Sequence, residues 1–103
     1  MALPVPVTIA SGFANLSGSS YRVITDQLYV TDAGAGEISA INAHTHVKTL
    51  LGSGYNAPSD VALSSDGIHA YVTEHPGTLL RVNLNNMNRA AATVVASGLN
   101  GIQ

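Results

Sequence analysis

The feature that most constrains how this chain can fold is an internal repeat. Residues 9–13 (IASGF) align with residues 51–55 (LGSGY), and residues 28–32 (LYVTD) align with residues 70–74 (AYVTE), in both cases about 42 positions apart. A third copy of the first motif begins at Val95, so the period is about 42 to 44 residues. A unit of this size cannot bury its apolar face alone and gains a core by stacking on its neighbours. The sequence therefore predicts stacked, similar units.

Each unit consists of short strands, because β-branched and aromatic runs alternate with turn residues and no apolar pattern has helical spacing. Strands are expected at residues 19–24, 28–32, 37–42 and 47–51 in the first copy and at 59–64, 70–74, 78–83 and 92–97 in the second. Polar turns are expected at residues 43–46 and 85–88. The predicted fold class is all-β, with four antiparallel strands in each copy. Four short strands at a period near 40 residues form the blade of a β-propeller.

The residues of these units also resemble a known family. The segments 28–32 (LYVTD), 56–67 (NAPSDVALSSDG) and 70–74 (AYVTE) are similar to the repeats of NHL and YVTN β-propeller proteins. Those repeats have a Tyr-Val-Thr core, a polar residue, a turn with Gly, and an aliphatic strand that ends in Asn. The resemblance covers nearly the whole chain and implies two blades. Propellers of this family usually carry about six or seven blades in one polypeptide, so this chain departs from the family in blade number.

The repeats predict four segments along the chain. These are an outer strand equivalent to the end of a preceding blade (1–13), a first blade (14–55), a second blade (56–98) and the start of a third repeat (99–103). Pro4 and Pro6 lie two residues apart, so their missing N–H groups point the same way, as at a sheet edge. In a symmetric ring the strands at 5–11 and 92–97 would compete for one outer edge. One of them is expected to be displaced, exchanged or added as a fifth strand.

Blade faces are buried only against neighbouring blades, and about four to eight blades close a ring. Two blades leave both terminal faces bare, so we expect the chain to assemble with other copies of itself. Three chains giving six blades is the leading arrangement, and two or four chains are its rivals, because cyclic symmetry closes head-to-tail contacts. The rim of such a ring could bind a protein or a carbohydrate.

The amino-acid composition argues against several functional classes. The net charge is −2, and the four basic residues are scattered singly, at Arg22, Lys48, Arg81 and Arg89. Because no basic stripe could follow a phosphate backbone, a nucleic-acid partner is not expected. The absence of cysteine excludes a disulfide framework and a thiol nucleophile. The first ten residues lack a basic region and contain two prolines, so neither a signal peptide nor a membrane span is expected. A soluble chain is expected, and the compartment stays open.

Candidate ligand residues are expected at the innermost strands. Asp60 stands near the start of the innermost strand of the second copy, where side chains of the resembled family can approach the central channel. With Asn56, Asn15 and Ser17 it forms the predicted rim or channel site. In a threefold assembly three Asp60 carboxylates could collect a cation, because hard cations prefer oxygen ligands. The competing interpretation is a hydrogen-bonded, structural Asp60.

Two imidazoles give a second set of metal candidates. His44 and His46 are two residues apart, and on an extended segment both could face the same ion, so they join Asp60 as possible ligands. Because both histidines lie in a predicted turn, an exposed polar role is favoured over metal binding. Asp32 and Glu74 occupy equivalent positions at strand ends, which favours a structural role over catalysis. No resident cofactor, bound metal or catalytic residue is expected.

Two classes of function remain open. The first is a non-enzymatic propeller that assembles into a ring and offers a rim for binding. The alternative is a lyase or lactonase-like enzyme with a metal in the central channel, held by Asp60, Asn56 or a histidine. The low number of charges and the lack of a convergent titratable cluster favour the binding module. A two-blade unit would also offer only symmetry-related ligands, whereas single-chain propeller enzymes take them from non-equivalent blades.

Overall fold

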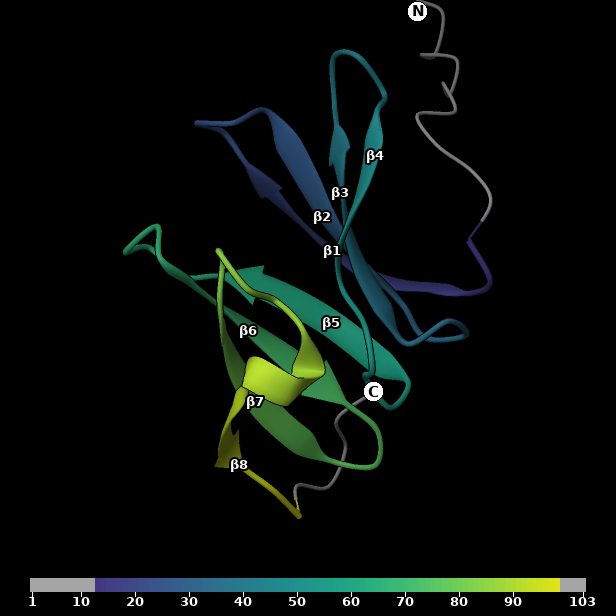
Figure 1. The fold of residues 1–103 in the computed structure, drawn as a ribbon, viewed down its shortest axis with the longest axis vertical. Coiled ribbons are helices and arrows are strands. Elements are labelled where there is room, and N and C mark those ends of the chain that lie inside the picture. The colour runs from purple at the N-terminus through teal and green to yellow at the C-terminus, as the bar shows by residue number, and fades with distance from the viewer. Residues whose placement is uncertain (1–12, 99–103) are drawn as a thin grey trace, which may run out of the picture.

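The computed structural model describes residues 13–98, which form two four-stranded antiparallel sheets (Figure 1). The first sheet contains β1 (Leu16–Arg22), β2 (Gln27–Asp32), β3 (Glu37–Asn42) and β4 (Lys48–Gly52). The second contains β5 (Pro58–Leu63), β6 (His69–Glu74), β7 (Thr78–Asn83) and β8 (Thr93–Ala96), with a 3₁₀ turn at Arg89–Ala91. The predictions of an all-β fold and of four antiparallel strands per unit are confirmed. Within this range there is no α-helix, and so none long and apolar enough to cross a membrane.

The strand boundaries agree with the sequence predictions to within one residue, except at β1. That strand was expected at residues 19–24, and it occupies Leu16–Arg22. It begins early because Ser17, in a serine-rich stretch with little apolar signal, pairs its hydroxyl with Thr31 of β2 at 2.8 Å. It ends early because Asp26 adopts a positive φ of 53° in the turn that follows. Asp is one of the residue types that tolerate this backbone region.

The strand pairings within the two sheets have the same register. The ladder between β1 and β2 slips by one residue between Leu16 and Gly18, and the ladder between β5 and β6 slips between Pro58 and Asp60. The ladders of the outer strands also slip at corresponding places in both sheets. Because side chains alternate between the faces of a sheet, residues about 42 positions apart on the β1–β2 and β5–β6 pairs point to corresponding faces.

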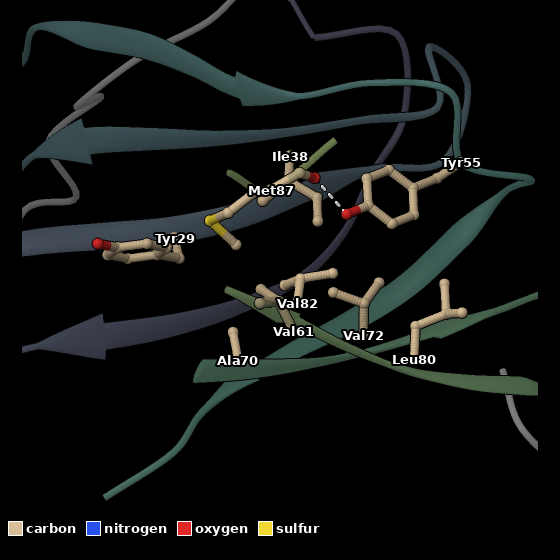
Figure 2. Close-up of a cluster of buried hydrophobic side chains, with 9 residues drawn as sticks. All are labelled: Tyr29, Ile38, Tyr55, Val61, Ala70, Val72, Leu80, Val82 and Met87. Carbon is tan, nitrogen blue, oxygen red and sulfur yellow. Dashed lines mark hydrogen bonds between the residues drawn. The ribbon is translucent and has the colours of Figure 1, made fainter. Parts of the chain in front are cut away.

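The core lies between the two sheets, which pack face to face (Figure 2). The buried cluster takes two side chains from the first sheet, five from the second and two from connecting segments: Tyr29, Ile38, Val61, Ala70, Val72, Leu80, Val82, Tyr55 and Met87. Along β6 the buried positions alternate with more exposed ones. One face of each sheet is therefore used for the core, and the other face points away from it.

Met87 joins this core from a segment with a polar sequence. The turn predicted at residues 85–88 is present, but Met87 within it is 1% exposed. Tyr55 donates a hydrogen bond from its hydroxyl to the Met87 carbonyl oxygen. The segment passes close to the end of β4, where Gly52 leaves room for the backbone of Met87 and Asn88. Because the neighbouring residues in the sequence are polar, the sequence does not indicate that Met87 is buried.

The outer edge of the second sheet is occupied by its own closing strand. β8 pairs with β7 through Leu80 with Val94 and Arg81 with Thr93. The competing strand predicted at residues 5–11 lies outside the described residues. The predicted closing strand at 92–97 thus completes its own sheet.

The sheets meet most closely where β1 lies beside β5. A Cβ at Gly18 would stand 2.7 Å from the Asp60 Cα atom and 2.7 Å from the Ser59 carbonyl oxygen. Both of these atoms belong to backbone, which cannot rotate out of the way as a long side chain can. The absence of a side chain at Gly18 therefore sets the spacing of the two sheets.

Replacing Gly18 tests this spacing. Gly18→Ala is expected to force β1 and β5 apart and to lower the free energy of unfolding by about 1–3 kcal/mol, the usual cost of overpacking. Urea unfolding followed by circular dichroism measures the change. Ser19→Ala, at the next and exposed position, is the control and is expected to stay within about 0.5 kcal/mol of the original chain. Equal stability of the Gly18 and Ser19 variants would contradict the close approach.

Candidate functional site

The residues predicted for a rim or channel site lie at the starts of β1 and β5, the first strands of the two sheets. Asn15 and Ser17 are at the start of β1, and Asn56 and Asp60 are at the start of β5, and all four are exposed. Ser17 connects the two sheets, since its Oγ donates to the carbonyl oxygen of Pro58 at 2.5 Å. The same Oγ lies 2.8 Å from the Thr31 Oγ1 atom. Ser17 is therefore a polar tie across the β1–β5 contact.

Asp60 lies at the same contact. One carboxylate oxygen accepts the N–H of Val61 at 2.8 Å, and the side chain lies against Gly18. Asn56 donates from Nδ2 to the carbonyl oxygen of His75 at 2.7 Å. The structure thus brings Ser17 and Asp60 to one junction. Within residues 13–98 no hydrogen bond joins an asparagine of the predicted site to either of them.

The Asp32 carboxylate is a structural anchor of the first sheet. It accepts four backbone N–H groups, from Ala14 at 2.9 Å, Asn15 at 2.8 Å, Gly34 at 3.2 Å and Ala35 at 3.2 Å. Burial by itself would raise the pKa of Asp32, but these four hydrogen bonds outweigh it and hold the pKa below its usual value. The ionised carboxylate ties the chain entering β1 to the turn after β2.

Glu74 has the corresponding place in the second sheet. Its Oε2 accepts the backbone N–H of Asn56 at 3.0 Å, as Asp32 accepts that of Ala14, and its Oε1 pairs with Arg89 Nε at 3.1 Å. Burial raises the pKa of the Tyr55 hydroxyl to about 12, the Glu74 charge adds to this, and Arg89 opposes it. Tyr55 therefore keeps its proton for the hydrogen bond to the loop. Both carboxylates have a structural role, as their equivalent positions at strand ends predicted.

The two imidazoles considered for a metal are exposed in the turn after β3. The carbonyl oxygen of Asn42 accepts the backbone N–H of His46 at 2.8 Å, and its side-chain oxygen accepts that of His44 at 2.8 Å. Their backbones thus build the turn, and His46 has a φ of 65°. Among residues 13–98 no three or more His, Asp or Glu side chains gather so that they could hold a metal ion. His44, His46 and Asp60 therefore form no joint site within this part of one chain.

A hollow lies on the face of the first sheet that points away from the core. Its volume is about 310 Å³, and it is lined by Leu16, Ser17, Gly18, Ser19, Leu28 and Val30. Of these residues only Ser17 was a predicted site residue. The hollow begins at the β1–β5 contact, so it adjoins the polar tie.

The sequence does contain a signal for this hollow. Three of its lining residues correspond, about 42 positions apart, to three core residues of the second sheet: Ser19, Leu28 and Val30 to Val61, Ala70 and Val72. The core residues are covered by the first sheet. The hollow therefore lies on the counterpart of the core face, and only part of its lining is exposed, since Val30 is 4% exposed.

No protein-family model and no curated protein matches this chain. The similarity to NHL and YVTN repeats accordingly stays a prediction from the residues quoted above.

The Asp32 anchor predicts an acid-dependent loss of stability. Because its folded-state pKa lies below the unfolded value, ionised Asp32 stabilises the fold above about pH 4, and this is lost as the pH falls through the folded-state pKa. Asp32→Asn places an amide against backbone N–H groups and is expected to cost about 1–3 kcal/mol at pH 7, with a weaker pH dependence of unfolding below about pH 5. Urea unfolding from pH 2 to pH 7 measures both effects. Glu37→Gln removes a charge from the same hairpin and is the control, and equal pH profiles of the two variants would contradict the anchor.

Proposed function

We propose that this chain is a β-propeller module of the NHL and YVTN type that closes a ring with other copies of itself and works as a binding module, not as an enzyme. The leading arrangement has three copies and six sheets, with two and four copies as rivals. The residues that resemble the family support the proposal, and so do the shared strand order and register of the two sheets. Sheets that stack face to face in one register can continue the stack in both directions.

The observation that carries the proposal is the contrast between corresponding aromatic positions. Tyr29 is 5% exposed in the core, whereas Tyr71, its counterpart on the second sheet, is 37% exposed. The face of the first sheet that points away from the core contains the hollow. A strand face that keeps a tyrosine and aliphatic side chains at the positions that are buried elsewhere is the kind of surface that associates. Joining unlike faces gives head-to-tail contacts, which close by cyclic symmetry.

The binding role is proposed for the starts of β1 and β5. In a ring these ends would recur around the central channel and present Asn15, Ser17, Asn56 and Asp60 from every copy. Short amide, hydroxyl and carboxylate side chains suit hydrogen bonding to a carbohydrate or to a protein surface. The low formal charge of −2 favours such neutral ligands over nucleic acid.

Solution mass tests the proposal. Light scattering coupled to size exclusion is expected to give three times the 10.5 kDa of one chain. A mass of two or four chains would replace the trimer and keep the self-assembly. A mass of one chain at micromolar concentration would refute the ring. Loss of the assembly in EDTA, reversed by a divalent cation, would indicate a metal on the ring axis, which the alternative metal-dependent enzyme requires.

A further inference from the structure

We infer that the contact between copies repeats the contact between the two sheets of one chain, so that Tyr71 of one copy enters the hollow of the next copy. The inference rests on the proposed self-assembly and goes beyond it by assigning the two faces, their register and the side chains that meet. The occupant of the hollow is thus a second copy of this chain.

The inserting surface is the face of the second sheet that points away from the core. It carries Tyr71 and Thr73, which alternate with the buried Val72 and Glu74 along β6. We call this surface the tyrosine face. Its residues correspond to Tyr29 and Thr31 of β2, and that face of the first sheet packs on the second sheet within the chain. The tyrosine face therefore keeps the tyrosine and the threonine of a surface that already packs in this molecule, but Arg81 lies opposite Tyr71 where Ala40 lies opposite Tyr29.

The receiving surface also has a buried counterpart. Figure 2 shows the Tyr29 ring beside the Met87 side chain, and Tyr29, Met87 and Ala70 all belong to the buried cluster. The corresponding surface on the first sheet is the floor of the hollow. Ser19 stands there in place of Val61 and leaves space, while the larger Leu28 stands in place of Ala70 and borders the hollow that a second aromatic ring would enter.

Two corresponding polar positions lie along the same junction. Within the chain, Ser17 bonds both to Thr31 of its own sheet and to the Pro58 carbonyl oxygen of the other sheet. Ser59 is the counterpart of Ser17, and its Oγ lies 2.7 Å from Thr73 Oγ1. The counterpart of Pro58 is Leu16, which lines the hollow. At the joint between copies Asp60 stands in the place of Gly18, so the backbones there lie further apart, and Ser59 faces Leu16 without the close contact that Ser17 makes with Pro58.

Two variants separate the faces. Tyr71→Glu blocks only the tyrosine face, and Ser19→Glu blocks only the hollow, because both positions are exposed and lie outside the core. A carboxylate buried without a partner opposes association. Each variant alone is expected to have the mass of one chain, since every junction would contain a blocked face. An equimolar mixture is expected to give the mass of two chains, because one junction with both native faces can form while the two remaining faces carry like charges.

Ile24→Glu is the matched control. Ile24 is 88% exposed in the turn between β1 and β2, outside both faces, so this variant is expected to keep the mass of the original chain. Loss of assembly in this control would overturn the inference, because it would indicate general hydrophobic association. Far-UV circular dichroism verifies that each variant folds, and Tyr71→Ser and Ser19→Gln serve as milder variants if a glutamate prevents folding.

The outcomes separate this inference from the proposed function. If the original chain has the mass of one copy, the proposed ring fails and the inference fails with it. If the original chain assembles and both blocked variants keep its mass, the ring stands and the assigned faces are wrong. If both variants have the mass of one chain and their mixture does not combine, the head-to-tail register is wrong. Heterodimers that form in the mixture, while each variant alone has the mass of one chain, would support the head-to-tail register.

Discussion

Between β1 and β5 the two sheets touch through backbone, because Gly18 has no side chain and the chain at Ser59 and Asp60 occupies the space that a Cβ would need. This contact sets how far apart the sheets stand, and so it decides which side chains can meet between them. At this spacing the Ser17 hydroxyl reaches the other sheet, and Tyr29 reaches the buried face of β6. The core and the polar tie both depend on the same missing side chain.

The carboxylates at the ends of β2 and β6 have corresponding structural roles where the chain enters each sheet. Asp32 and Glu74 each accept a backbone N–H from the short segment that precedes β1 or β5, respectively. Their remaining partners differ, since Asp32 also binds the following turn and Glu74 pairs with Arg89. The two sheets thus share one way of fixing the inner strand and differ in how the rest of the anchor is satisfied.

Most strands could be predicted from the sequence because turn residues and alternation are local signals. The start of β1 could not, because Ser17 is placed by hydroxyl bonds to residues distant in sequence. Met87 could not either, because an asparagine-rich stretch gives no sign of burial. Of the predicted site residues, Ser17 and Asp60 lie together at the contact between β1 and β5. Asn56 instead bonds to the His75 carbonyl oxygen, and Asn15 donates its backbone N–H to Asp32. The sequence contains a mixed signal for the hollow, since at the repeat distance the smaller Ser19 replaces Val61 while the larger Leu28 replaces Ala70.

The difference between Gly18 and its counterpart Asp60 has a consequence for any stack built from this chain. Inside one chain a glycine allows backbone contact, but between copies the corresponding position carries the Asp60 side chain, so the inner strands there must stand further apart. A ring would then alternate close and wide joints. The wide joints all fall between polypeptides, so subunit exchange would begin at them, while each chain leaves and rejoins as an intact pair of sheets.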